Sequence, residues 1–418
     1  MSRWIKVSLA VLLILAITPA IPALAQTNED CQFYGEHSNG AKYCITMPPP
    51  PPYGEWNGDL VIFAHGYVAV TEPVDIPWSQ MTFTYGDQEI TLPLLVNSMG
   101  YAFATTSYSV NGLAVQEGIA DVLDLIDVFE TQVGTPTNIY LVGASEGGLV
   151  TTLAIERYPG SFTGGLATCG PIGSFRGQVD YWGDFRVVFD YFMDRHGLNV
   201  LPGNAMSIPA SLMNKWDSVY TSRIGGMLGD NASNTEQLLS VTKAPVTADP
   251  LTIGETILGN LWYNVFATED AIKKLGGKPY DNRDRIYTGS LDDDLLNEGV
   301  KRYKAQQAAL EEIAMKYETS GVLTRPLITM HTTGDPIVPY WHQTQYTAKV
   351  LANTPYPALY YWPIEVNAYG HCNFSLQNIL DGFGTLIYMS TGQILPPPPF
   401  LVSASVQAEA YQFAPDIR

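Results

Sequence analysis

Basic residues are scarce in this sequence. Its 418 residues include 22 Lys and Arg against 41 Asp and Glu, which gives a formal net charge of −19 at pH 7. Nucleic-acid binding relies on basic side chains that neutralise phosphates, so this balance argues against a nucleic-acid partner. The charge says little about a small substrate, because net charge mainly reports on solubility and steering.

Metal-binding motifs and long internal apolar runs are also missing. The chain contains neither CxxC nor HExxH, so the sequence gives no support for a zinc site. No segment after residue 25 resembles a transmembrane helix, and stable membrane insertion is not expected. Hydrophobic residues make up 46% and charged residues 15% of the chain. These proportions predict a sizeable buried core, in one large domain with an insertion or in two modest domains.

The first 25 residues have the pattern of a secretory signal. Arg3 and Lys6 precede an apolar stretch over residues 7–17, and Ala23-Leu24-Ala25 gives a small-x-small cleavage pattern before Gln26. The alternative is an uncleaved membrane anchor, which the short apolar stretch and its following prolines disfavour. We therefore expect cleavage near Ala25 and a secreted protein, extracellular or periplasmic.

Apolar strands alternate with amphipathic helices through most of the remaining chain. Continuous apolar runs predict buried strands at residues 60–64, 102–108, 138–142, 164–169, 326–331 and 359–364. Helices are predicted between them, with apolar residues at steps of three and four, as at Ile119, Val122, Ile126 and Phe129. The alternation is typical of an α/β protein with a mostly parallel central sheet flanked by helices.

The alternation stops near residue 175 and resumes near residue 322. The intervening stretch is rich in aromatic residues and helical patterns, and its last helix is predicted to include Val300, Tyr303, Leu310, Ile313 and Tyr317 on one face. We interpret this stretch as a large helical cap inserted into the α/β core. The resulting division of the chain is a signal peptide (1–25), an N-terminal lead-in (26–58), the core (59–174 and 322–395), the cap (175–321) and a C-terminal tail (396–418).

A G-x-S-x-G motif lies between a predicted strand and a predicted helix, at Gly143-Ala144-Ser145-Glu146-Gly147. This context is required for a nucleophile elbow, a tight turn that exposes the serine hydroxyl at the sheet edge. The motif alone is weak, since a plain strand-to-helix turn can carry two glycines. The Glu146 side chain is expected at the surface or in a salt bridge.

A serine nucleophile needs a base, and the base needs an orienting acid. Asp335 lies in a loop just after a predicted strand, within Gly334-Asp335-Pro336-Ile337-Val338-Pro339, and His371 follows the last predicted strand. Only six histidines are present, which keeps the assignment of the base narrow. The chain order Ser145, Asp335, His371 is the one used by serine hydrolases of one large α/β class.

At these residues the sequence resembles the α/β-hydrolase superfamily, on its esterase and lipase side. The resemblance implies that Ser145 is the nucleophile, His371 the base and Asp335 its orienting acid. The His65-Gly66-Tyr67 segment resembles the oxyanion loop of the family. The backbone N–H groups of Tyr67 and Glu146 would then bind the oxyanion.

The four cysteines, Cys31, Cys44, Cys169 and Cys372, suggest two disulfides in an exported chain. Three pairings are open. Cys169 ends the strand after the nucleophile strand, and Cys372 lies in the histidine loop that returns to Ser145, so we expect Cys169–Cys372 and Cys31–Cys44. A cysteine next to the histidine, as Cys372 is next to His371, resembles the arrangement in tannases and feruloyl esterases. Those families place the partner cysteine directly before the serine, where this sequence has Ala144.

The expected function is that of a secreted serine carboxylic-ester hydrolase acting through an acyl-enzyme, without metal or organic cofactor. Its substrate would be a small-molecule or polymeric ester with apolar or aromatic groups, with lipid and polyester both open. Trp182 and Phe185 of the cap are predicted to contact the substrate. Alternatives are a serine peptidase or amidase of the same fold, and a non-catalytic binding protein on this scaffold. The sequence gives no indication of the oligomeric state.

Overall fold

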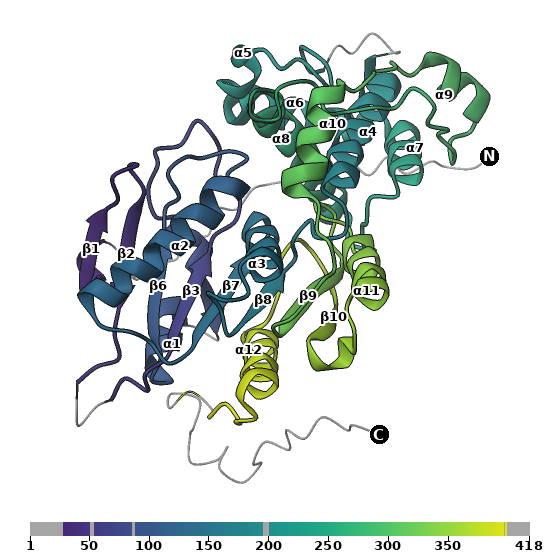
Figure 1. Ribbon diagram of the computed structural model, residues 1–418. Coiled ribbons are helices and arrows are strands. Elements are labelled where there is room, and N and C mark those ends of the chain that lie inside the picture. Colours follow the sequence, from purple (N-terminus) through teal and green to yellow (C-terminus); the bar gives the residue numbers. More distant parts are fainter. Residues whose placement is uncertain (1–27, 51–53, 86–87, 195–199, 397, 399–418) are drawn as a thin grey trace, which may run out of the picture.

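The computed structural model of the chain describes residues 28–50, 54–85, 88–194, 200–396 and 398 (Figure 1). The predicted signal peptide, and all of the predicted tail except residues 396 and 398, lie outside these residues. The described strands are β1 Phe33–Glu36, β2 Lys42–Thr46, β3 Leu60–Ala64, β4 Thr82–Tyr85, β5 Gln88–Thr91, β6 Ala102–Thr106, β7 Ile139–Ala144, β8 Gly164–Thr168, β9 Leu327–Gly334 and β10 Tyr361–Tyr369. The described α-helices are α1 Leu92–Ser98, α2 Val115–Gln132, α3 Glu146–Arg157, α4 Phe175–Asp194, α5 Ala210–Met213, α6 Thr221–Asp230, α7 Ala232–Thr242, α8 Leu251–Lys274, α9 Asp293–Gly299, α10 Gln307–Glu312, α11 Trp341–Asn353 and α12 Leu376–Thr391.

Eight strands form one central sheet in the order β1-β2-β6-β3-β7-β8-β9-β10. The six strands from β6 to β10 in this order run parallel, whereas β1 and β2 pair antiparallel and extend the sheet at one edge. The lead-in thus supplies two strands of the sheet through the pairing of β2 with β6. Parallel strands carry their carboxyl ends to the same edge, so the loops that follow β3, β7, β8, β9 and β10 meet there.

Helices cover both faces of the sheet, as the continuous apolar strands predict. Along β3, Leu60 and Ile62 point into a core shared with α2, α3 and α11. Their neighbours Val61 and Phe63 point into a second core, shared with α1 and α12. Each strand side chain alternates between the two faces, which is why an all-apolar sequence is needed for a strand buried on both sides.

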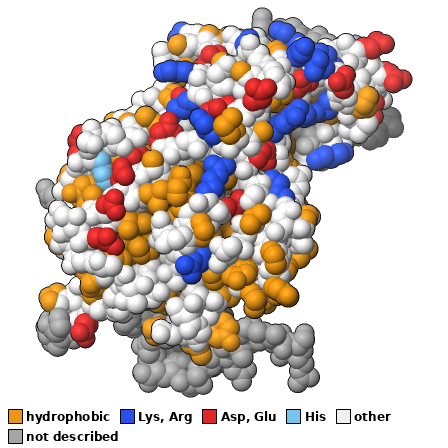
Figure 2. Space-filling view, viewed as in Figure 1, with side chains coloured by type: hydrophobic (Ala, Val, Ile, Leu, Met, Phe, Trp, Pro, Cys, Tyr) orange, Lys and Arg blue, Asp and Glu red, His pale blue; other side chains and the backbone are white. Residues whose placement is uncertain are grey.

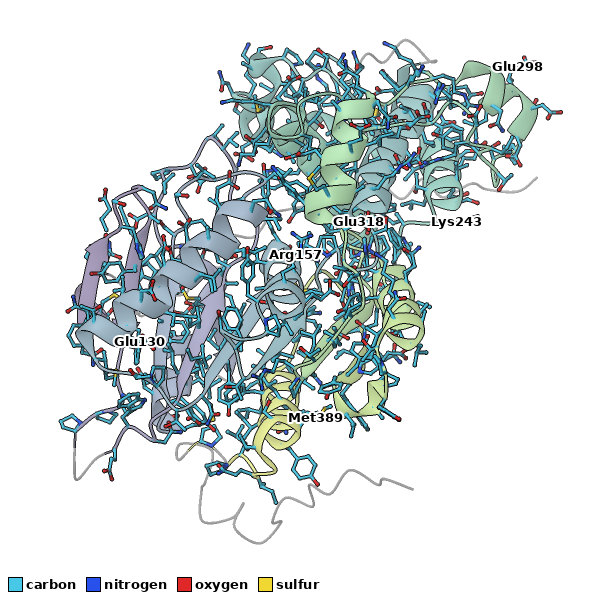
Figure 3. All side chains as sticks on the ribbon, in the orientation of Figure 1. Glu130, Arg157, Lys243, Glu298, Glu318 and Met389 are labelled. Carbon is cyan, nitrogen blue, oxygen red and sulfur yellow. A yellow bond between two sulfur atoms is a disulfide. The ribbon has the colours of Figure 1, made fainter. Side chains whose placement is uncertain are left out.

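Helices α4 to α10 form a separate group at one end of the sheet, called the cap below (Figure 1). The cap has its own hydrophobic core, built mainly from α4, α6, α7 and α8. Glu318, labelled in Figure 3, lies where the chain leaves the cap. Its carboxylate accepts hydrogen bonds from Ser174 Oγ (3.1 Å) and Arg176 N (3.0 Å), and it pairs with Lys349 of α11 (3.1 Å). One side chain therefore ties both ends of the cap to the sheet domain.

The last helix of the cap is shorter than predicted. It begins at Gln307 and continues as a π-helical turn over Ile313–Tyr317, whereas Val300 and Tyr303 lie before it in extended chain. Asn282 is the reason, because its backbone N–H donates to Tyr303 O (3.2 Å), its side-chain Nδ2 donates to Lys301 O (3.0 Å), and Tyr303 N donates to its Oδ1 (2.7 Å). These tertiary bonds use backbone groups that a helix would need.

Strand β10 is longer than predicted and reaches Tyr369. Its second half includes the polar residues Glu365 and Asn367, which end the apolar run in the sequence. β10 is the terminal strand of the sheet, and most of its side chains are partly or fully exposed. Polar residues are therefore tolerated there, and hydrophobic periodicity underestimates the length of the strand.

The surface shows the two regions differently (Figure 2). On the face shown, Lys and Arg side chains gather over the cap and along its border with the sheet domain, acidic side chains lie on both regions, and the broader apolar patches lie on the sheet domain. Among the described residues, none of the helices is both long and apolar enough to cross a membrane.

Candidate active site

Ser145 lies in a tight turn between β7 and α3. Its backbone has φ 57° and ψ −120°, a region that L-residues rarely adopt and that is common at functional sites. A Cβ on Gly143 would clash with the carbonyl oxygen of Gly147, and one on Gly147 would clash with that of Ala64. The glycines of the motif are thus needed by the close approach of the elbow to its own helix and to β3.

Three side chains from three loops form a continuous hydrogen-bonded chain. His371 Nε2 lies 2.8 Å from Ser145 Oγ, and His371 Nδ1 lies 2.7 Å from Asp335 Oδ2. Because a carboxylate only accepts, Nδ1 carries the proton, which leaves Nε2 free to accept the Ser145 hydroxyl. The three residues follow β7, β9 and β10, so the parallel sheet brings together residues up to 226 positions apart.

Asp335 is fully buried, yet it is held ionised. Burial alone would raise the pKa of this carboxyl, but His371 and His331 beside it hold the pKa at about 2. Its other oxygen, Oδ1, accepts the backbone N–H groups of Ile337 and Val338, both at 2.9 Å. The carboxylate is therefore fixed in position and available to stabilise a protonated His371.

The Gly66–Tyr67 peptide is held from two sides. His65 Nδ1 is hydrogen-bonded to Gly66 O at 2.7 Å, and burial lowers the pKa of His65 to about 4, so the ring is neutral. Gln80 Oε1 accepts Gly66 N–H (2.7 Å), and Gln80 Nε2 donates to Tyr67 O (3.2 Å). Since a trans peptide points its C=O and N–H in opposite directions, the Tyr67 N–H points away from His65. Gln80 had no signal in the sequence.

Glu146 is the first residue of α3, so its backbone N–H lies at a helix N-terminus directly after the candidate nucleophile. Its side chain, expected to be exposed or salt-bridged, is instead buried at 7% exposure. Oε1 accepts Ala114 N–H at 2.9 Å, and Oε2 has no hydrogen-bond partner among the described residues. Burial raises the pKa of Glu146 to about 8, against the effects of the Ala114 bond and Lys274.

A pocket opens between Ser145 and the cap and is lined almost entirely by apolar groups. Trp182 of α4 and Tyr263 of α8 lie on its cap side, and Leu149 and Val338 on its sheet side. Trp182 therefore lines the pocket, and its expected contact with a substrate stays a prediction. Phe185 does not line the pocket, because it is fully buried in the core of the cap one helical turn further along.

A second opening lies on the His371 side of the same centre. It is lined by Glu255, Trp262 and Tyr263 of α8 together with Pro336 and the loop that carries His371. Tyr263 lines both openings. In the sequence, Tyr263 is one aromatic residue of an amphipathic helix, and nothing in the pattern distinguishes it from packing residues.

The cap also holds the acid loop. Gln178 Nε2 and Trp182 Nε1 both donate to Ile337 O, at 2.9 and 3.2 Å, and Asn260 Nδ2 donates to Pro336 O at 2.9 Å. The backbone that directly follows Asp335 is thus anchored to α4 and α8. A displacement of the cap would disturb the acid as well as the pocket.

Two disulfides are present, and all four cysteines take part in them. Cys31 pairs with Cys44, and Cys169, after β8, pairs with Cys372 next to His371. Cys169, His371 and Cys372 are the one group of potential metal ligands found in the described part of the chain. Because both sulfurs are in the disulfide, neither is a thiolate that could bind a metal.

The chain has the α/β-hydrolase fold, as the sequence predicts: a mostly parallel eight-stranded sheet covered by helices on both faces, with the tight turn of Ser145 at its carboxyl edge. Similar solved structures include an acylaminoacyl peptidase in complex with Z-Gly-Gly-Phe-chloromethyl ketone, 11% identical with a TM-score of 0.40 over 87% of this chain and 41% of the peptidase. Est1E from Butyrivibrio proteoclasticus is 13% identical, with a TM-score of 0.37 over 86% of this chain and 99% of Est1E.

Mouse alpha/beta hydrolase domain-containing protein 10 is 14% identical, with a TM-score of 0.36 over 83% of this chain and 93% of that protein. The present chain therefore spans about two fifths of the length of the peptidase and most of the length of the other two proteins. Neither the protein-family models nor the curated protein sequences gave a match.

Proposed function

We propose that this protein is a serine hydrolase that cleaves carboxylic esters through a covalent acyl-enzyme on Ser145. One observation carries the proposal: Ser145, His371 and Asp335 form a hydrogen-bonded chain, and Ser145 at its end lines an apolar pocket. Such a chain makes a serine hydroxyl nucleophilic, because the imidazole accepts its proton as the new bond forms.

In the first half of the reaction, Ser145 Oγ attacks the ester carbonyl carbon and His371 Nε2 takes the hydroxyl proton. The carbonyl oxygen becomes an oxyanion, to which the backbone N–H groups of Tyr67 and Glu146 donate. The oxyanion collapses, and His371 returns the proton to the departing alcohol. Water then attacks the acyl-enzyme through the same steps and releases the acid. Asp335 stays ionised throughout and stabilises the imidazolium.

The two openings suggest where each half of the substrate binds. The apolar pocket lies on the Ser145 side and suits an apolar or aromatic acyl group. The alcohol receives its proton from His371, so it belongs in the opening on the His371 side. Lipid and polyester esters both fit this description, and Trp182 would contact the acyl group.

We also propose that the chain is exported and cleaved near Ala25. Support comes from the basic, apolar and small-residue pattern of residues 1–25 and from the two disulfides, which persist in oxidising compartments. N-terminal sequencing of the protein recovered from culture medium or periplasm tests this. A mature chain that starts close to Gln26 is expected, and retention of Met1 would contradict the proposal.

A fluorophosphonate probe tests the nucleophile. The probe should label the protein once, at Ser145, and Ser145→Ala should abolish both labelling and ester hydrolysis. The substrate class is tested by matched chromogenic esters and amides of varied acyl length. Faster turnover of amides would identify the peptidase alternative, and failure to label or to turn over any ester or amide would favour a binding protein.

A further inference from the structure

Tyr263 is held over the candidate active site by three aromatic rings. Its ring stacks on Trp182 of α4, with centroids 4.8 Å apart and planes within 7°. Trp262 meets it edge-on at 5.0 Å, and the ring of Tyr67 lies 5.8 Å away. Because contacts on several sides fix the ring, the direction of its hydroxyl is set by the cap and not by solvent.

Tyr263 and Ser145 line the same pocket, and their side chains are close enough to interact, since Ser145 has a lowering effect on the pKa of the Tyr263 phenol. Burial is the main cause that raises the pKa of this phenol above its usual value, so the phenol keeps its proton and can act as a donor. The ring also lines both the acyl-side pocket and the His371-side opening. An ester bound with one half in each opening would place its reacting carbonyl beside Tyr263.

We propose that Tyr263 is a catalytic residue, a third oxyanion donor that the cap supplies to the tetrahedral intermediate formed at Ser145. This inference rests on the proposed ester-hydrolase function. During attack, the new Ser145 Oγ–carbon bond forms, the carbonyl electron pair moves to oxygen, and the serine proton moves to His371. Tyr263 transfers no proton, and its O–H donates a hydrogen bond to the developing oxyanion.

The oxyanion is favoured over the leaving-group oxygen for two reasons. The leaving group already has a proton donor in His371, which lies 2.8 Å from Ser145 Oγ. The Tyr263 ring contacts the ring of Tyr67, whose backbone N–H is the expected donor of the oxyanion loop. Tyr67 also donates its hydroxyl to Phe266 O of α8 at 3.0 Å, so the oxyanion loop and the helix that carries Tyr263 are bound together.

The test compares Tyr263→Phe with wild type on two esters of the same acid. One has a p-nitrophenol leaving group, which departs without a proton, and the other has a simple alkyl alcohol, which needs one. Loss of an oxyanion donor should lower kcat/KM for both esters equally, by about 100-fold. KM should change little, since the hydrogen bond strengthens as charge develops.

Tyr303→Phe is the matched control. It removes a buried hydroxyl from the same cap, one that has no hydrogen-bond partner among the described residues, and it should leave kcat/KM unchanged. Phenylalanine keeps the ring contacts of Tyr263, so both variants should melt at the wild-type temperature. Fluorophosphonate labelling of Ser145 gives a second measure, and its rate should fall in Tyr263→Phe to a similar degree.

Two results would overturn the inference. A loss confined to the alkyl ester would place the hydroxyl at the leaving group, and no loss on either ester would make Tyr263 only a wall of the pocket. Failure of the proposed function is a separate outcome, because wild type would then hydrolyse neither ester and Ser145 would not be labelled. An active wild type, an inactive Ser145→Ala and an unimpaired Tyr263→Phe would reject this inference alone.

Discussion

The α/β core and the cap contribute to the candidate site in different ways. The core supplies Ser145, Asp335 and His371 from loops at one edge of a parallel sheet, with hydrogen bonds of 2.7 and 2.8 Å between them. The cap supplies Trp182 and Tyr263, which line the pocket, and it holds the acid loop through Ile337 O. The core therefore fixes the reacting groups, while the cap fixes what surrounds them.

The two regions also differ in how they are stabilised. The sheet of the core is sandwiched between two hydrophobic cores, and ladder hydrogen bonds fix its register. The cap has one hydrophobic core of its own, and its described residues contain none of the named strands. Glu318 joins the ends of the cap to Lys349 of the sheet domain. The comparison teaches that the triad depends on the core, whereas the choice of substrate depends on the cap: changes at the core edge should remove activity, and changes in the cap lining, Tyr263 apart, should mainly redirect it.

The sharpest test of this comparison concerns the core. Single changes Ser145→Ala and His371→Ala should each lower kcat by about 10⁴- to 10⁶-fold, and Asp335→Ala by somewhat less. Because the three residues act as one unit, the double variant Ser145→Ala/His371→Ala should be no slower than Ser145→Ala. Steady-state kinetics on a p-nitrophenyl ester measures this, and additive losses would show that the residues do not form a unit.

Neighbouring cap residues provide the second test. Phe185→Ala should lower the free energy of unfolding by about 3–5 kcal/mol, because a large, fully buried side chain of the cap core is removed. Trp182→Ala should instead change the ratio of kcat/KM between short and long acyl esters by roughly 10-fold, with a smaller effect on melting. If Trp182→Ala only lowers the melting temperature, the aromatic wall does not select substrate.

The two disulfides give a comparison within the core. Cys169–Cys372 closes a segment with a sequence separation of 203 residues and Cys31–Cys44 one of 13. In the chain-entropy account the longer loop stabilises more, about 5 kcal/mol against about 3 kcal/mol. Replacing Cys169 and Cys372 by alanine should also reduce kcat, since Cys372 is next to His371. The Cys31→Ala/Cys44→Ala variant is the control and should keep its activity. Equal losses of activity in the two variants would show that the Cys169–Cys372 disulfide has no special effect on His371.

The last test concerns Glu146 and is measured as a dependence of stability on pH. Its pKa is raised by burial from 4.5 to about 8, so the folded chain holds a proton that the unfolded chain has lost. This stabilisation is complete below about pH 4.5 and is lost as pH rises toward 8, at up to about 1.4 kcal/mol per pH unit. In Glu146→Gln that slope should disappear, because the amide does not ionise. Urea unfolding at pH 5, 7 and 9 measures it, and an unchanged slope would show that Glu146 is not its source.

The core was largely predictable from the sequence because its signals are local and redundant. Apolar runs such as residues 60–64 must be strands when both faces are buried, and the strand–glycine–serine–glycine–helix pattern at Ser145 requires a tight turn. The bounds of the last strand moved from residues 359–364 to Tyr361–Tyr369, because exposure of an edge strand permits polar residues. In the cap, hydrophobic periodicity wrongly predicted a helix at residues 300–306. Their backbone groups instead form hydrogen bonds with Asn282, which lies in another loop.

The sequence by itself determined the fold class, the alternation of strands and helices and the order of the three candidate catalytic residues, because each depends on spacing along the chain. Only the tertiary structure decided the rest. It buried Glu146 beside Ser145, turned Phe185 into the cap core and Trp182 toward the pocket, and brought Tyr263 and Gln80 to the site. Such positions depend on how two separately packed regions meet, and neither hydrophobic period nor motif spacing encodes the contacts between them.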